Sequence, residues 1–269
     1  MLSTALFVFS NAQLSIKSEV VVSGIPLTLF SLSQGIGSTR KLFVFHGTDR
    51  NAQEYCEHSA TLATAGGFSV TTPLFDKERF PSWRYHRGGI QDEKGQLRPR
   101  HEWTYSIVEK LIRPIQRAQP VYMIGHSAGG QFLNRMCAFA GTSARRVVVG
   151  NPGSVIFPRS DWKFPFGMGG LSPSLSSDDA IRAYLAQPMT FLLGTADNKP
   201  DENFDTSKEA MRQGGGRLQR STNCFNYGKN LAQKRGWAFN WRLETVKEVG
   251  HDHQKMFDAP EARKAILEP

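Results

Sequence analysis

The stretch Gly125-His126-Ser127-Ala128-Gly129 decides the fold class of this chain. It follows an apolar run at 121–124 and precedes a stretch at 131–140 with the composition of a helix. A Gly-x-Ser-x-Gly pattern between a strand and a helix is typical of a nucleophile elbow, a sharp turn that strains the backbone of the serine. The residues two positions before and after that serine must be very small, and both are glycines here. The pattern therefore predicts an accessible, reactive hydroxyl at Ser127.

Short apolar runs alternate with helical stretches on both sides of this turn. Because strands that alternate with helices favour a mostly parallel sheet covered on both faces, we predict an α/β fold. No repeat or low-complexity linker interrupts the pattern, so residues 1–269 are expected to form one domain. The predicted strands are 19–24, 25–32, 41–45, 68–72, 121–124, 146–150, 189–194 and 240–246, and the predicted helices are 53–65, 102–117 with a kink at Pro114, 131–140, and one starting near Pro260.

The composition is that of a globular protein with a basic surface. Hydrophobic residues make up 39% of the 269 positions, and 33 Lys and Arg against 24 Asp and Glu give a net charge of +9. The basic residues are scattered, and no nucleic-acid-binding motif accompanies them, so we interpret them as a solvated surface and expect no nucleic-acid partner. A nucleic-acid binder would retain DNA in a salt-sensitive way.

Cysteine spacing and the N-terminus give few further constraints. Cys56, Cys137 and Cys224 form no Cys-x-x-Cys pair, so neither a disulfide framework nor a zinc site follows, and a Cys56–Cys224 pair is left open. Residues 1–12 resemble a signal peptide only weakly, because no basic residue precedes the short apolar stretch. We expect an N-terminal extension or a first strand there. The expected location is cytoplasmic, with secretion left open. No run reaches the ~20 apolar residues of a membrane span.

A serine hydroxyl needs a base, and histidines at the carboxyl ends of strands are the candidates. His46, His126 and His251 occupy such positions. His126 adjoins Ser127 and points away from its hydroxyl, while His46 opens a His-Gly turn and is interpreted as structural. His251 is therefore the predicted base, with His253 as its local competitor.

A carboxylate should orient that imidazole, and the order serine, acid, histidine predicts where it lies. Asp197 follows the strand at 189–194 and falls between Ser127 and His251. Asp201, Glu202 and Asp205 are alternatives in a polar loop that is interpreted as solvated surface. Their spacing matches no calcium loop, and no metal is expected.

The oxyanion that forms during acyl transfer needs hydrogen-bond donors already in place. The backbone N–H of Ala128, directly after the serine, is the first predicted donor. The second is the N–H of Thr48, because Gly47 permits a tight turn after the strand at 41–45.

Four segments together resemble the α/β-hydrolase superfamily: 45–47, 125–129, 194–197 and 250–252, within a likeness that covers about residues 15 to 265. The resemblance implies an eight-stranded, mostly parallel sheet and a serine acyl-enzyme mechanism without a cofactor. More loosely, the chain is similar to the bacterial esterase and polyester-depolymerase branches. It departs from the branch with a His-Gly-Gly-Gly motif, since Thr48 and Asp49 follow Gly47.

Two aromatic loops are the predicted substrate-binding segments. The first aromatic loop, 80–89, carries Trp83 and Arg84. The second aromatic loop, 151–175, is a candidate lid or cap with Trp162, Phe164 and Phe166. Exposed aromatic residues suit an apolar acyl or polymer cleft. The same aromatic residues are equally consistent with anchoring a long loop to the rest of the domain. Arg84 either pairs with a carboxylate on the substrate or is exposed to water.

The sequence therefore predicts a serine hydrolase that cleaves carboxylic esters, including short-chain esters or aliphatic polyesters. A peptidase or amidase with the same triad and a non-catalytic binding protein of this fold are the alternatives.

Overall fold

One eight-stranded sheet runs through the molecule, in the strand order β1-β2-β4-β3-β5-β6-β7-β8. The computed structural model describes residues 15–33 and 37–268. The β1–β2 and β2–β4 pairs are antiparallel and all others are parallel, which confirms the predicted α/β class. The strands are β1 (Ser15–Val22), β2 (Ile25–Leu32), β3 (Lys41–Phe45), β4 (Ser69–Pro73), β5 (Val121–His126), β6 (Arg146–Gly150), β7 (Met189–Gly194) and β8 (Arg242–Val246).

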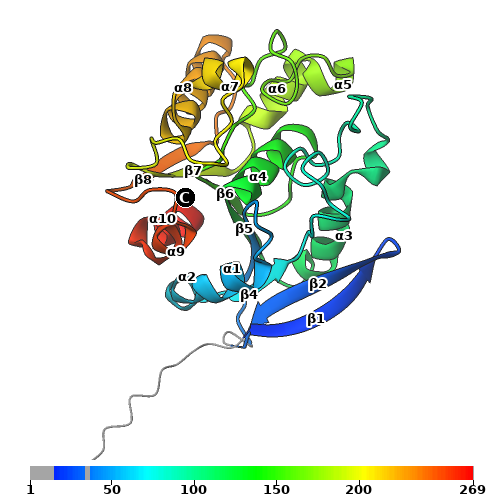
Figure 1. Ribbon diagram of the computed structural model, residues 1–269, viewed down its shortest axis with the longest axis vertical. Coiled ribbons are helices and arrows are strands. Elements are labelled where there is room, and N and C mark those ends of the chain that lie inside the picture. The colour runs from blue at the N-terminus through cyan, green and yellow to red at the C-terminus, as the bar shows by residue number, and fades with distance from the viewer. Residues whose placement is uncertain (1–14, 34–36, 269) are drawn as a thin grey trace, which may run out of the picture.

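Helices cover both faces of the sheet (Figure 1). One face packs against α3, α4, α6 and α8, and the other against α1, α2, α9 and α10. The helices are α1 (Ala52–His58), α2 (Ala60–Gly66), the 3-10 turn η1 (Arg100–Glu102), α3 (Thr104–Gln116), α4 (Ala128–Phe139), α5 (Pro173–Ser176), α6 (Asp178–Leu185), α7 (Lys208–Gln213), α8 (Arg217–Arg235), α9 (His253–Asp258) and α10 (Pro260–Leu267).

The central strands are apolar on both sides because each side faces a hydrophobic core. In β3, Phe43 and Phe45 enter one core while Leu42 and Val44 enter the other. Each fully buried side chain of this size contributes about 1.5–3 kcal/mol to folding. This alternation fixes the register of β3 and therefore the point where its carboxyl end, and the loop after it, emerges.

One helical prediction needs correction, and the helices α5 to α9 were not predicted. The expected helix at 53–65 is two helices, α1 and α2, which meet at the buried Ser59, whose hydroxyl donates to the carbonyl of Cys56. The long helix α8 was not predicted, because its buried face is made largely of small residues: Ser221, Cys224, Gly228 and Ala232. They follow helical spacing but give a weak hydrophobic signal.

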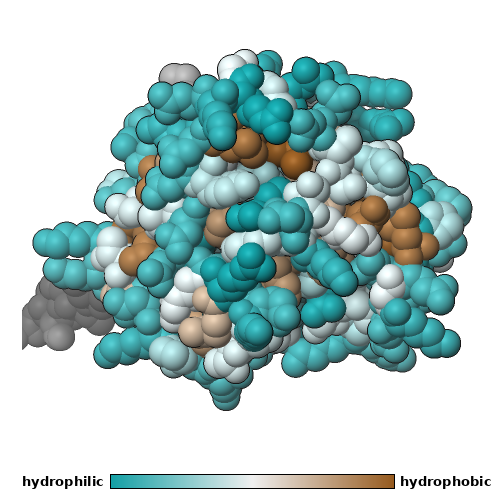
Figure 2. Space-filling view, turned by 90° about the horizontal axis from the view of Figure 1, so that it is seen from above, coloured by the Kyte–Doolittle hydropathy of each residue, from teal (hydrophilic) through white to brown (hydrophobic). Residues whose placement is uncertain are grey.

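The surface seen from the side of α5 to α8 is mainly hydrophilic, with separate small hydrophobic patches (Figure 2). None of the helices in the described part of the chain is long and apolar enough to cross a bilayer. The three cysteines are buried and free, so the structure does not join Cys56 to Cys224. The prediction for residues 1–12 lies outside the described residues.

Candidate active site

The elbow at Ser127 joins β5 to α4 at the carboxyl edge of the sheet. Ser127 has φ 57° and ψ −116°, a conformation that a non-glycine residue adopts only when its surroundings enforce it. A side chain on Gly129 would collide with the carbonyl oxygen of Phe45, and one on Gly130 would come within 2.6 Å of the carbonyl oxygen of Gly150. The close approach of α4 to β3 and β6 therefore requires these glycines.

His251 and Asp197 are joined by a hydrogen bond of 2.8 Å between Nδ1 and Oδ2. Asp197 follows β7 and its side chain is 2% exposed, whereas the His251 side chain, in the loop after β8, is 21% exposed. Because Nδ1 faces the carboxylate, Nε2 is left as the proton acceptor. The His251 ring lies 4.6 Å from the ring of His126, the residue before Ser127. Within the described residues, no hydrogen bond joins Ser127 Oγ to His251.

Arg217 is a site residue that the sequence analysis missed. It begins α8, is buried, and donates from Nη1 to Asp197 Oδ1 at 3.3 Å and from Nη2 to Asp201 Oδ1 at 2.7 Å. The Asp197 carboxylate thus lies between an imidazole and a guanidinium. This ion pair offsets the cost of burying the carboxylate charge.

Asn151, which follows β6, was also missed as a site residue. Its side chain accepts from the N–H of Gly194 at 2.9 Å and donates to the carbonyl of Gly250 at 3.1 Å. The same amide nitrogen lies 3.3 Å from His126 Nε2. Asn151 therefore links the end of β7, the loop of His251 and the elbow. Its own backbone has a positive φ of 38°.

His46 and His126 are buried, neutral imidazoles. The backbone N–H of Phe75 donates to His46 Nε2 at 3.1 Å, and burial lowers the pKa of His46 to about 3. Burial also holds the pKa of His126 well below its usual value, and its Nδ1 lies 3.3 Å from the Tyr55 hydroxyl. The contact with Phe75 agrees with a structural role for His46. The contact with Tyr55 shows that the His126 ring packs against buried residues.

Among the described residues, the alternative base and acids form no hydrogen bond with His251 or with the Asp197 carboxylate. His253 Nε2 is 2.9 Å from His58 Nδ1, and its ring stacks on Tyr55. Asp201 pairs with Arg217, whose hydrogen bond lowers the pKa of that carboxyl group. Glu202 and Asp205 are exposed.

The two predicted oxyanion donors are Ala128, directly after the serine, and Thr48, in the turn after β3. Ala128 is the first residue of α4, where backbone N–H groups have no partner within the helix. Thr48 follows Gly47, and a Cβ on Gly47 would lie 3.8 Å from Ser127 Cβ, so this turn faces the serine. Neither N–H has an acceptor among the described residues.

Known structures share this arrangement of elements. Poly(aspartic acid) hydrolase-1 from Sphingomonas sp. KT-1 is 30% identical, with 94% of this chain and 98% of that chain covered and a TM-score of 0.84. The poly(3-hydroxybutyrate) depolymerase LpqC from Bordetella parapertussis is 29% identical over 90% of this chain and 87% of that one, with a TM-score of 0.81. The chain belongs to the α/β-hydrolase superfamily.

A more distant match shows the fold alone. An esterase from Pyrococcus furiosus is 13% identical over 93% of this chain and 89% of that chain, with a TM-score of 0.51. No family model matches the sequence of this α/β-hydrolase, and neither does a curated protein.

In the first aromatic loop of this α/β-hydrolase, the side chains of Trp83 and Arg84 contact residues close to them in the sequence. Trp83 donates from its indole N–H to Glu93 at 3.0 Å. Arg84 donates to the carbonyl of Arg79 at 2.9 Å and lies over the ring of Phe80. These contacts favour a structural role for both side chains, and a substrate-binding role for them is still a prediction.

The second aromatic loop lines a cavity of about 580 Å³. Its predicted residues Trp162, Phe164 and Phe166 line this cavity, while Ser127 and His251 do not. Three cations and three carboxylates also line it: Arg87, Lys163, Arg212, Asp161, Asp205 and Glu209. The loop is anchored to α4, because Arg135 donates to the carbonyl of Pro165 at 3.0 Å.

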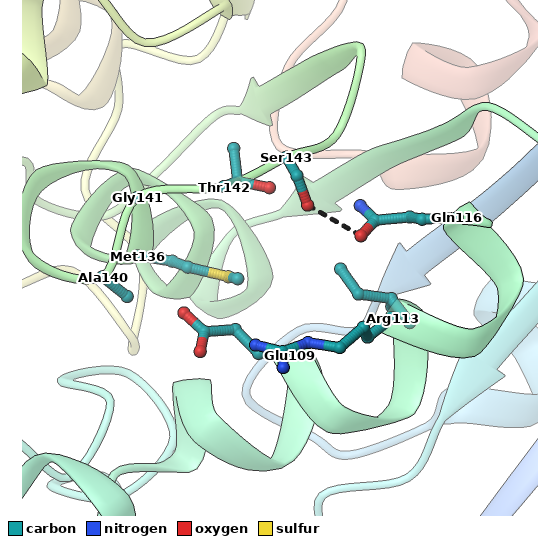
Figure 3. Close-up of a pocket in the computed structure, with 9 residues that line it drawn as sticks. Glu109, Arg113, Gln116, Met136, Ala140, Gly141, Thr142 and Ser143 are labelled. Atoms are coloured by element: carbon teal, nitrogen blue, oxygen red, sulfur yellow. Dashed lines mark hydrogen bonds between the residues drawn. The ribbon is translucent and has the colours of Figure 1, made fainter.

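A second cavity lies at the opposite, amino-terminal edge of the sheet (Figure 3). Glu109 and Arg113 of α3 face Met136 and the segment after α4, and Ser143 donates to Gln116 at 2.7 Å. It holds none of the predicted site residues, so we assign it no part in the reaction.

Proposed function

We propose that this α/β-hydrolase is a serine hydrolase that cleaves carboxylic esters through an acyl-enzyme. The observation that carries the proposal is the Asp197–His251 hydrogen bond beside a strained serine elbow. In the order Ser127, Asp197, His251, the three side chains follow the carboxyl ends of β5, β7 and β8. That order and placement are those of a hydrolytic triad.

In the proposed reaction, Ser127 Oγ attacks the ester carbonyl while its proton passes to His251 Nε2. The negative charge on the carbonyl oxygen is stabilised by the N–H groups of Ala128 and Thr48. His251 then returns the proton to the departing alkoxide, which leaves as an alcohol. Water, deprotonated by His251, then attacks the acyl-enzyme. His251 returns that proton to Ser127 Oγ as the acid is released, and Asp197 stabilises the imidazolium at each step.

The test is hydrolysis of p-nitrophenyl butyrate by the native chain and by Ser127→Ala. We expect the variant to lose about a thousandfold or more in kcat with an unchanged circular dichroism spectrum. Ser18→Ala, which removes an exposed hydroxyl of β1, is the matched control and should retain native turnover. Native turnover by a folded Ser127→Ala protein would refute the proposal.

Amide cleavage is the second candidate, and one observation favours it. The 30% identical structure is that of a poly(aspartic acid) hydrolase, and poly(aspartic acid) is a chain of amides with carboxylate side groups. The charged side chains that line the cavity beside the second aromatic loop balance one another, so they give no preference for an anionic chain: Arg87, Lys163 and Arg212 against Asp161, Asp205 and Glu209.

Parallel assays separate the two candidates. Soluble products are measured from poly(3-hydroxybutyrate) films and from poly(aspartic acid) with the same enzyme preparation. Release from the polyester alone supports the ester assignment, and release from poly(aspartic acid) alone supports the amide one.

A further inference from the structure

We propose that Glu54, His58 and His253 form a binding site for a transition-metal ion of the zinc class, at the surface between α1 and α9. Glu54 and His58 lie four residues apart on α1, and His253 is the first residue of α9. They are brought together from segments almost 200 positions apart, outside the triad. The inference is independent of the proposed function.

The three ligand atoms have the spacing that a small divalent ion requires. His58 Nδ1 and His253 Nε2 are 2.9 Å apart, and Glu54 Oε1 lies 3.8 Å from the first and 3.6 Å from the second. The centre of a triangle with these sides is about 2.0 Å from each corner, which is the length of a zinc–nitrogen or zinc–oxygen bond. An ion at this point would replace the hydrogen bond between the two rings.

The surrounding residues orient two of the three ligands. Asn51 donates to Glu54 Oε2 at 2.8 Å, which leaves Oε1 to face the imidazoles. The His253 ring stacks on the Tyr55 ring, with 3.8 Å between the ring centroids and an interplanar angle of 5°. The Phe257 ring packs edge-on against the His253 ring, with 6.0 Å between the centroids. Such outer contacts fix the direction of a ligand before the ion arrives.

The donor set selects the class of ion. Two imidazoles and one carboxylate suit zinc, cobalt, nickel and copper, whereas calcium and magnesium prefer sites made of oxygen alone. The side chains of Glu54, His58 and His253 are 49%, 28% and 15% exposed, so an ion can enter from solvent and a water molecule can complete its coordination. The three protein ligands leave a tetrahedral ion one open position.

A bound ion would tie α1 to the loop that carries His251. His253 lies two residues after His251, and its stacking partner Tyr55 contacts His126 through its hydroxyl. Metal binding is therefore expected to raise the melting temperature of the whole chain, because an ion that binds only the folded state stabilises it.

The experiment uses the full chain, stripped with EDTA and dialysed into metal-free buffer. We expect one Zn²⁺ per chain by calorimetry and visible d–d absorption on adding Co²⁺. His58→Ala and Glu54→Gln should each weaken Zn²⁺ binding at least about tenfold and remove the zinc-dependent rise in melting temperature. Since Glu54 is exposed, the second variant tests the site even if the first folds poorly.

His101→Ala is the matched control, because this imidazole is 78% exposed and lies on η1, away from the site. It should bind Zn²⁺ as the native chain does. Absence of saturable binding, or native affinity in both ligand variants, would overturn the proposal. Loss of the ion in His251→Ala with retention in His58→Ala would also overturn it, because the ion would then occupy the triad.

Discussion

Arg217 shows how a single buried side chain can determine the geometry of this site. Its guanidinium, 2% exposed, lies between the carboxylates of Asp197 and Asp201, and only Asp201 reaches solvent, at 40% exposure. Asp197 therefore has a fixed cation on one side and the His251 imidazole on the other. We interpret Arg217 as a positioning residue that acts through Asp197.

Replacing Arg217 with Met should lower both stability and activity. Removing one partner of a buried ion pair leaves an uncompensated charge and costs about 3–5 kcal/mol in the free energy of unfolding. We expect kcat for p-nitrophenyl butyrate to fall more than KM changes, because the imidazole loses its orientation. Urea unfolding and steady-state kinetics measure both. Asp201→Asn, at the exposed end of the network, should cost much less, and equal costs in the two variants would argue against the role of Asp197 in the network.

His46 is expected to make the free energy of unfolding depend on pH in acid. Burial lowers its folded pKa to about 3, whereas an unfolded histidine titrates near 6.5. Below about pH 6.5 the unfolded chain binds a proton that the folded chain does not, so the free energy of unfolding falls as the pH drops towards 3. Above that range this group contributes no slope.

The measurement is the free energy of unfolding between pH 4 and 7 for the native chain and for His46→Gln. The glutamine oxygen can still accept from the N–H of Phe75, and it carries no titrating group. The slope should become shallower by at most about 1.4 kcal/mol per pH unit. His101→Gln, at an exposed position, should retain the native slope, and an unchanged slope in His46→Gln would contradict this account.

At the scale of elements, the junction of β5 and α4 tolerates no added atoms. A Cβ on Gly129 would meet the backbone of Phe45 and His46, and neither carbonyl can move without disturbing β3. Gly129→Ala is therefore expected to destabilise the chain by several kcal/mol, on the order of the largest single-residue effects. Thermal unfolding tests this. Gly215→Ala is the control, because its Cβ would meet only a flexible glutamine side chain at 3.4 Å, and equal losses would contradict the packing argument.

The elements that could be predicted are those with a strong local signal. The strands at 41–45, 146–150 and 189–194 were predicted at their observed bounds, because they are near-continuous apolar runs. The helix α8 was missed because small residues form most of its buried face, and the break between α1 and α2 depends on a buried serine that no periodicity marks. Strand order, with β4 between β2 and β3, is set by long-range pairing.

For the whole molecule, the sequence identified residues but could not measure their separation. Ser127, Asp197 and His251 were named from chain order and strand ends, and the structure joins the last two directly. Arg217 and Asn151 were missed because each acts through contacts with residues 16 to 99 positions away. The grouping of Glu54 and His58 with His253 could not be predicted for the same reason, since His58 and His253 are 195 positions apart. That residues 1–269 form one domain, with 151–175 as a lid, is still a prediction.

The most direct test of the central claim is labelling of the native chain with a fluorophosphonate, followed by mapping of the adduct by mass spectrometry. A hydroxyl made reactive by the Asp197–His251 pair should give one adduct per chain, on Ser127, and Ser127→Ala should give none. His251→Ala should label far more slowly. A folded native protein that takes up no label, or carries it on another residue, would contradict the account.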